Sequence, residues 1–222
     1  MVHALSVPLT VNVILFDLDG TIADTDEVIV QAYYALYDHF REGKRTPREE
    51  IYYFSGPPVR ETFAKEFPGM EFDVLFAYFR EVTKDLYPKY IKQFPRCNDL
   101  LRELKKLGYK LGVVTNKMRE PTMMCIPLLD MEGIFDSIVC PDDVIDKKPL
   151  PEPIYKAMRE CGERDISKVL YVGDNNSDYV CACNAGVDCM LVTWGPRKQD
   201  PTLKPKYKIA DFSEFLEAIE HE

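Results

Sequence analysis

Two carboxylates one residue apart, Asp17 and Asp19, follow an apolar run of four residues, 13–16. Such a run predicts a buried strand, and residues at i and i+2 of a strand point to the same side. Carboxylates held this close repel each other unless a cation or a shared proton intervenes. A hard cation such as Mg²⁺ would relieve the repulsion and leave one carboxylate free to attack phosphorus. A plain strand with an Asp-Gly turn has the same pattern, so the pair alone leaves both interpretations open.

Two later segments add groups that suit a phosphate. The apolar run 111–114 ends at Thr115 and Asn116, whose hydroxyl and amide can hydrogen-bond a phosphoryl oxygen without adding charge. Lys147 and Lys148 then precede a predicted helix, and a lysine here could neutralise phosphate charge. Strand-end turn chemistry and a solvated lysine pair are the ordinary explanations of such segments taken singly.

A fourth segment carries two more carboxylates, Asp174 directly after Gly173 at a strand end and Asp178 four residues later. If a helix begins near Asn175, Asp178 faces back toward the same crevice, one turn along. Each segment is a weak signal by itself. The ordered set of four, each at the end of a predicted strand, favours one shared site.

This set resembles the haloacid dehalogenase (HAD) superfamily in its phosphatase branch, from about Val11 to the C-terminus. The pattern of that family is an Asp-x-Asp-Gly-Thr strand end, a Ser/Thr strand end, a Lys ahead of a helix and a Gly-Asp-x-x-x-Asp strand end. All four occur here in that order. Dehalogenating members typically lack an Asp at the position of Asp19, so the resemblance implies a phosphatase and argues against a dehalogenase.

The resemblance also implies the catalytic roles. Asp17 would be the nucleophile that forms an aspartyl-phosphate, and Asp19 would act as general acid on the leaving group and then as general base for water. Lys148, adjacent to Pro149 and preferred over Lys147 for that reason, would screen the charge of phosphate and nucleophile. A carboxylate nucleophile splits hydrolysis into two steps, and one neighbouring acid/base serves both.

The remaining implied roles concern the phosphate and the metal. Thr115, assisted by Asn116, would hold the phosphoryl group. Asp178 would support the metal shell or orient the lysine. The implied ligands of Mg²⁺ are the Asp17 carboxylate, the Asp19 backbone carbonyl and the Asp174 carboxylate.

The chain that must position these residues has two parts with different secondary-structure patterns. From residue 98 onward helices and strands alternate, which predicts an α/β fold with a doubly wound parallel sheet and the catalytic groups at the carboxyl ends of its strands. The expected strands after the first are 109–115, 134–140, 168–172, 188–193 and 207–209. The expected helices of this part are 98–107, 119–130, 152–161, 176–185 and 212–220.

Residues 24–95 are instead rich in aromatic residues at helical spacing, with helices expected at 27–40, 47–54, 59–67 and 72–90. An insertion at this point resembles the helical cap of family members of the phosphoglycolate phosphatase and β-phosphoglucomutase type. We therefore expect a catalytic core of residues 1–22 and 96–222 and a helical cap of 23–95. Arg60, after the Gly56-Pro57-Pro58 breaker, could bind a carboxylate or second phosphate of the substrate, although a solvated helix residue explains it equally well.

The composition of the chain limits the classes of partner that it can bind. The formal net charge of −9 and the lack of a basic patch argue against nucleic acid, and apolar runs of strand length argue against a membrane span. The N-terminus lacks the basic region of a secretory signal. Seven cysteines without regular spacing indicate reduced thiols in a cytoplasmic protein, and no partner motif makes Cys181 and Cys183 a metal site. We expect a monomer or weak dimer.

The sequence thus predicts a Mg²⁺-dependent phosphatase that hydrolyses a small phosphomonoester, most like phosphoglycolate phosphatase. Enzymatic alternatives that share the four segments are an inorganic pyrophosphatase, a sugar-phosphate phosphatase, a nucleotidase and a β-phosphoglucomutase-type mutase. The non-enzymatic alternative is a binding protein on a HAD scaffold. Intact Asp17, Asp19, Lys148 and Asp174 argue against it, because binding alone does not require an acid/base beside a nucleophile.

Overall fold

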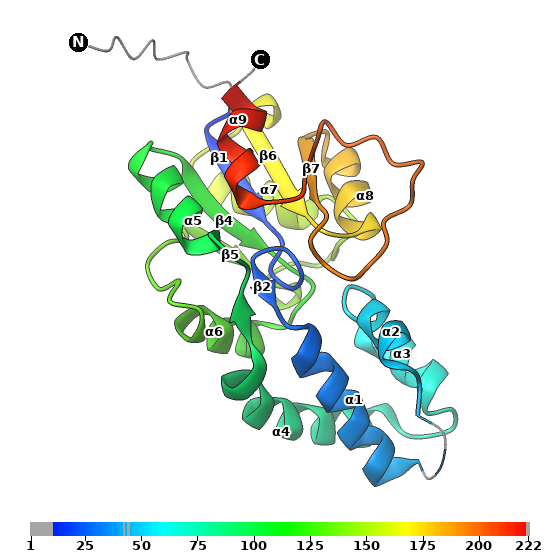
Figure 1. Ribbon diagram of the computed structural model, residues 1–222. Helices are drawn as coiled ribbons and strands as arrows, with labels where there is room; N and C mark the ends of the chain where they lie inside the picture. The colour runs from blue at the N-terminus through cyan, green and yellow to red at the C-terminus, as the bar shows by residue number, and fades with distance from the viewer. Residues whose placement is uncertain (1–10, 42, 44, 221–222) are drawn as a thin grey trace, which may run out of the picture.

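The computed structural model describes residues 11–41, 43 and 45–220, with a six-stranded parallel sheet at its centre (Figure 1). The strand order is β5-β4-β1-β6-β7-β8, which confirms the predicted α/β class. The strands are β1 (Val13–Phe16), β4 (Lys110–Val114), β5 (Ser137–Val139), β6 (Val169–Gly173), β7 (Asp188–Val192) and β8 (Tyr207–Ile209). The later strands start up to three residues inside their predicted ranges.

The central strand β1 explains why the site forms where it does. β1 pairs in parallel with β4 on one side and β6 on the other, and Phe16 lies opposite Val113 and Val172. All four residues of β1 are buried, as expected for a strand covered on both faces. Because strand order reverses across β1, the connections leave in opposite directions and open a crevice at its carboxyl end.

Alternate residues of β1 pack on opposite faces of the sheet. Ile14 and Phe16 join the apolar cluster under α5 (Cys97–Lys106), α6 (Arg119–Leu128) and α9 (Phe215–Glu220). Val13 and Leu15 join the cluster under α7 (Glu152–Glu160) and α8 (Asn176–Ala185). The start of α8 is well defined, because Asn175 caps it and forms a capping box with Asp178.

The inserted helices form a separate layer with an aromatic core (Figure 1). They are α1 (Asp26–Phe40), α2 (Arg48–Ile51), α3 (Val59–Glu66) and α4 (Phe72–Tyr90). Tyr33 of α1 makes edge contacts with Phe63 of α3 and Phe79 of α4, and α1 packs along α4. The predicted ends of α4 and α8 are confirmed. The helices expected at 47–54 and 212–220 instead each divide into a 3-10 turn and a short α-helix.

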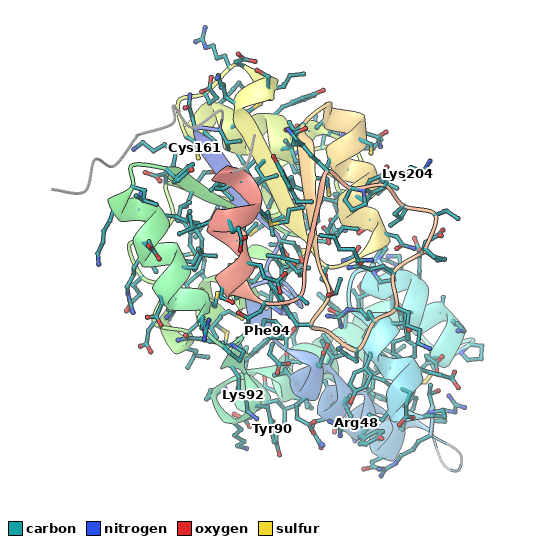
Figure 2. All side chains as sticks on the ribbon, turned by 45° about the horizontal axis from the view of Figure 1, so that its top comes forward. Arg48, Tyr90, Lys92, Phe94, Cys161 and Lys204 are labelled. Atoms are coloured by element: carbon teal, nitrogen blue, oxygen red, sulfur yellow. The ribbon has the colours of Figure 1, made fainter. Side chains whose placement is uncertain are left out.

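Two short strands that the sequence did not predict join the helical layer to the sheet. β2 (Ala23–Asp24) pairs antiparallel with β3 (Lys92–Gln93), where the chain leaves the core and returns to it. Tyr90, Lys92 and Phe94 mark the returning segment in Figure 2. Two-residue strands carry too little periodicity to be recognised in a sequence.

The structure also describes the state of the cysteines and the length of the apolar helices. All seven cysteines are free thiols, and only Cys183 of them is exposed. Within the described ranges, no helix combines the length and apolar character that crossing a membrane requires.

Candidate active site

Lys148 connects the carboxyl end of β1 to groups on β4, β6 and α8. Its buried ammonium donates to Asp17 Oδ1 (2.6 Å), Asp178 Oδ1 (2.8 Å), the Val114 carbonyl (3.1 Å) and the Tyr171 hydroxyl oxygen (2.9 Å). Burial alone would lower the pKa of Lys148, but Asp17 and Asp178 raise it above its ordinary value. The lysine is therefore a fixed positive charge beside the expected nucleophile, whereas Lys147 is exposed.

Asp178 uses both carboxylate oxygens inside the protein. Oδ1 faces Lys148, while Oδ2 accepts from the backbone N–H groups of Asp174 (3.1 Å) and Asn175 (3.2 Å). Gly173 permits this approach, because a Cβ at that position would clash with the Asp178 side chain. Asp178 therefore contacts both the lysine and the loop of Asp174.

Arg197 reaches into the site from the loop after β7, and sequence reasoning missed it. Its side chain is 5% exposed and donates from Nε to Asp174 Oδ2 (2.8 Å) and from Nη1 to Asp26 Oδ1 (2.5 Å) and the Tyr52 carbonyl (3.2 Å). It therefore ties the loop of Asp174 to the start of α1 and to the 3-10 turn that follows α2. Gly20 makes room for it, since a Cβ there would clash with the guanidinium, and φ of +87° suits glycine.

Asp19 is held by a second lysine that sequence reasoning also missed. Lys117 Nζ lies 3.0 Å and 3.1 Å from the two Asp19 oxygens and 4.5 Å from the Tyr87 ring centroid, and Thr25 Oγ1 donates to Asp19 Oδ1 at 2.9 Å. Burial alone would lower the pKa of Lys117, but the Asp19 carboxylate raises it well above its usual value. The only sequence signal was a lysine two positions after the strand-end Thr115.

A cavity of about 540 Å³ opens above these groups. Six of the sequence-predicted site residues line it, whereas Asp174 and Asp178 are buried and do not. The six are Asp17, Asp19, Arg60, Thr115, Asn116 and Lys148. The Asn116 amide donates to the Lys148 carbonyl at 3.3 Å, and the Arg60 guanidinium lies 3.7 Å from the Phe72 ring centroid.

A family model described as haloacid dehalogenase-like hydrolase matches residues 14–192. This chain belongs to the haloacid dehalogenase-like hydrolase family. Pyrophosphatase PpaX of Bacillus velezensis is 36% identical over 209 residues, covering 93% of this chain and 95% of that protein. Pyrophosphatase PpaX of Bacillus pumilus is 32% identical over 212 residues, covering 95% and 97%. The predicted family and the prediction of an enzyme are therefore confirmed.

Solved structures share the fold of this hydrolase over nearly its whole length. CbbY from Rhodobacter sphaeroides, in complex with phosphate, has a TM-score of 0.81 at 22% identity, covering 95% of this chain and 99% of CbbY. A haloacid dehalogenase-like family protein from Streptococcus pneumoniae has a TM-score of 0.80 at 24% identity, covering 94% and 98%. At these identities the likeness is one of fold.

The donor set of the hydrolase fits a divalent cation. Oxygens of Asp17, Asp174 and Asp178 lie within 4.8 Å of one another in the part of the chain that the structure describes, and all three residues are buried. Burial raises the pKa of Asp17 to about 8 and that of Asp174 to about 6, in spite of their cationic partners. Buried carboxylates crowded in this way are the oxygen ligands that Mg²⁺ prefers. Neither Cys181 nor Cys183 belongs to this cluster.

The ion pairs around the cluster do not neutralise all of its carboxylates. Three cations are paired with five carboxylates, so two negative charges remain uncompensated when all five carboxylates are ionised. The cations are Lys117, Lys148 and Arg197, and the carboxylates are Asp17, Asp19, Asp26, Asp174 and Asp178. A single divalent cation would balance that difference.

Replacement of Arg197 by Met tests this charge balance without an activity measurement. The change strips Asp174 and Asp26 of their partner, which should lower the free energy of unfolding by about 3 kcal/mol, the lower end for a broken buried pair. Mg²⁺ should then raise the melting temperature of the variant more than that of the parent, because the cation supplies the missing charge. Differential scanning fluorimetry with and without MgCl₂ measures both effects. Lys198→Met, at an exposed position, is the control, and equal Mg²⁺ shifts in variant and parent would contradict the charge balance.

Proposed function

We propose that this hydrolase is a Mg²⁺-dependent phosphatase that cleaves an organic phosphomonoester through an aspartyl-phosphate on Asp17. The observation that carries the proposal is the buried Asp17 carboxylate on the cavity floor, 2.6 Å from Lys148 and adjacent to the acid/base candidate Asp19. A nucleophile, a fixed cation and a proton carrier are what phosphoryl transfer by way of a covalent intermediate requires.

In the first step the Asp17 carboxylate attacks phosphorus, the ester P–O bond breaks, and Asp19 gives a proton to the departing oxygen. In the second step Asp19 takes a proton from water, whose oxygen attacks the aspartyl-phosphate and releases inorganic phosphate. Lys148 and the Thr115 hydroxyl bind equatorial oxygens of the phosphoryl group in both steps.

The metal would be held by carboxylates already described. We assign its ligands to the Asp17 and Asp174 carboxylates and the Asp19 backbone carbonyl, with Asp178 in a supporting position. Bound Mg²⁺ supplies positive charge that offsets the repulsion between these carboxylates and the phosphate. The two oxygens of Asp178 are engaged by Lys148 and by backbone N–H groups, which supports an orienting role for that residue.

We propose that residues 23–95 act as a cap over a core of 1–22 and 96–222, of which residues 1–10, 42, 44 and 221–222 lie outside the described residues. The β2–β3 pair, Ala23 opposite Gln93, supports these boundaries because the chain crosses between the layers there. A cap of this kind would exclude water from the reaction and carry substrate contacts. Free, buried thiols support the expected cytoplasmic location.

Inorganic pyrophosphate is the second candidate substrate, because the relatives that are 36% and 32% identical are named pyrophosphatases. The same nucleophile, cation and acid/base would serve that reaction. A β-phosphoglucomutase-type mutase and a non-enzymatic binding protein share the scaffold and are outcomes of the same test.

A panel of phosphate compounds decides among these functions. We expect Mg²⁺-dependent phosphate release from p-nitrophenyl phosphate, ethyl phosphate and phosphoglycolate, with loss of activity in EDTA and recovery on adding Mg²⁺. Preference for pyrophosphate would support the second candidate, and isomerisation of a sugar phosphate without phosphate release would support a mutase. No turnover of any compound, or undiminished activity in EDTA, would overturn the proposal.

Replacement of Asp19 by Asn tests the acid/base. A p-nitrophenolate leaving group needs no proton, so kcat/KM for p-nitrophenyl phosphate should change little, while kcat falls because hydrolysis of the intermediate lacks its base. For ethyl phosphate kcat/KM should fall by about 10² to 10⁴, the usual value of general acid catalysis. The backbone carbonyl persists, so Mg²⁺ affinity by calorimetry should be preserved. Equal losses of kcat/KM for both substrates would assign Asp19 another role.

Replacement of Arg60 by Ala tests whether this residue binds a second anion. Since Arg60 lies against Phe72 at the first turn of α4, we use ω-carboxyalkyl phosphates of increasing length. The loss in kcat/KM should appear once the carboxylate can reach Arg60, and should then amount to about 10- to 150-fold for a charged hydrogen bond. Lys65→Ala removes an exposed cation from α3, the helix that also carries Arg60, and is the matched control. A loss that is the same at every chain length would make Arg60 a structural residue.

A further inference from the structure

One face of α4 forms a wall of the catalytic cavity along the length of the helix. Besides the charged residues Arg80 and Lys84, five residues of α4 line the cavity, at intervals of four, three, four and four positions, which places them on one side of a helix. They are Phe72, Phe76, Phe79, Thr83 and Tyr87. Three of the five are phenylalanines, so this face of α4 is apolar in the part that is remote from the catalytic carboxylates, with Arg60 and Arg80 beside it.

The facing wall also carries apolar side chains, next to the charged Glu120. Met118, Pro121 and Met124, at the start of α6, line the same cavity, and α6 packs beside α4 (Figure 1). Met118 is 41% exposed. An ion pair between Arg80 of α4 and Glu120 of α6 closes the gap between the two helices. Apolar side chains left facing an open cavity are unfavourable in water, and an apolar ligand would cover them.

The cavity also extends well past the phosphate site. Tyr87 marks the catalytic end, because its ring lies 4.5 Å from Lys117 Nζ, which is paired with Asp19. Phe72 is 15 positions earlier on α4, about 22 Å away at the rise of an α-helix. Pyrophosphate, two phosphoryl groups that share one oxygen, would touch the catalytic end and leave the Phe76 region empty.

We infer that the substrate is a phosphomonoester whose alcohol carries an extended apolar carbon skeleton, which lies between Phe76 and Phe79 of α4 and Met124 of α6. This inference rests on the proposed phosphatase function and names the substrate class of that site. The phosphate occupies the floor at Asp17, and the apolar group extends along α4 toward Phe72. Phe76 and Met124 then determine specificity, and neither takes part in the chemistry.

A homologous series of n-alkyl phosphates, from ethyl to octyl, tests the inference. The pKa of the alkanol leaving group is nearly constant in such a series, so kcat/KM reports burial of the chain. We expect kcat/KM to rise about three- to fourfold for each methylene that enters the apolar part, the value of transferring a CH₂ group out of water. Inorganic pyrophosphate and phosphoglycolate should be turned over less efficiently than hexyl phosphate.

Two variants locate the effect. Phe76→Ala and Met124→Ala should flatten the dependence on chain length while leaving ethyl phosphate within about threefold of the parent, because a short chain does not reach them. Val74→Ala, on the opposite side of α4 and 52% exposed, should keep the full dependence and is the matched control. Thermal denaturation of each variant verifies that it is folded.

The outcomes separate the inference from the function on which it rests. Hydrolysis of ethyl phosphate at the same efficiency as octyl phosphate, or a preference for pyrophosphate over hexyl phosphate, would overturn the inferred substrate class and leave a phosphohydrolase. Absence of phosphate release from every compound would overturn the proposed function itself. An unchanged chain-length dependence in both variants would remove the specificity role from the α4–α6 walls.

Discussion

Asp17→Asn should abolish turnover and leave the fold intact. The amide has nearly the shape of the carboxylate but cannot form the aspartyl-phosphate, so kcat should fall by about 10⁴ to 10⁶, the scale seen on removing a covalent nucleophile. Phosphate release from p-nitrophenyl phosphate measures this loss. Mass spectrometry of the trapped parent enzyme should show an added phosphoryl group that the variant lacks.

The same variant should keep its stability or gain some. Burial raises the pKa of Asp17 to about 8, which means that holding this carboxylate ionised is unfavourable in the folded protein. A neutral amide removes that cost, while Lys148 keeps Asp178 as its partner. The melting temperature should therefore be at least that of the parent. Asp85→Asn, at an exposed position on α4, is the control for a general effect of neutralisation. Substantial activity in Asp17→Asn would exclude Asp17 as the nucleophile.

Lys148→Met should damage both activity and stability. The lysine side chain is 2% exposed and contacts two carboxylates, so its loss leaves Asp17 and Asp178 buried without a partner. Breaking a buried pair in this way typically costs about 3–5 kcal/mol. For a protein of this size the melting temperature should fall by roughly 6–20 °C. Loss of a cation that stabilises the transferring phosphoryl group should lower kcat by about 10³ to 10⁵.

A second variant separates the two roles of Lys148. Adding Asp178→Asn to Lys148→Met removes one of the unpaired carboxylates, so the double variant should regain part of the lost stability and none of the activity. Lys147→Met, at the exposed neighbouring position, should resemble the parent in both measurements. If Lys148→Met melts at the parent temperature, the ion pairs contribute no net stability, and recovery of activity in the double variant would exclude a direct role in catalysis.

The strand ends that carry the motifs could be predicted from the sequence, because the residue patterns that mark them are local. Three apolar runs that stop at polar residues predict parallel strands, and parallel strands of one sheet bring their carboxyl ends to one edge. Asp17 and Thr115 therefore meet at one cavity although they are far apart in the chain, and Lys148 joins them from the loop before α7. The extent of α4 was also predictable, since nineteen residues at helical spacing carry a strong periodic signal.

Long-range partners could not be predicted in this way. Arg197 is 23 positions from Asp174 and 171 from Asp26, so no local pattern connects them. The contact of Lys117 with Asp19 spans 98 positions. The packing of loops on neighbouring strands decides which of these groups face each other. The loops have no regular sequence period from which that packing could be predicted.

The sequence by itself determined which reactive residue types the site contains, because these residues lie at or near strand ends that a parallel sheet brings to one edge. Only the tertiary structure decided what surrounds that chemistry. The aromatic stripe from Phe72 to Tyr87 has the spacing of a core-forming face, yet part of it lines the cavity beside α6. Whether a helical face is covered or open depends on the elements opposite it, which helical spacing does not encode.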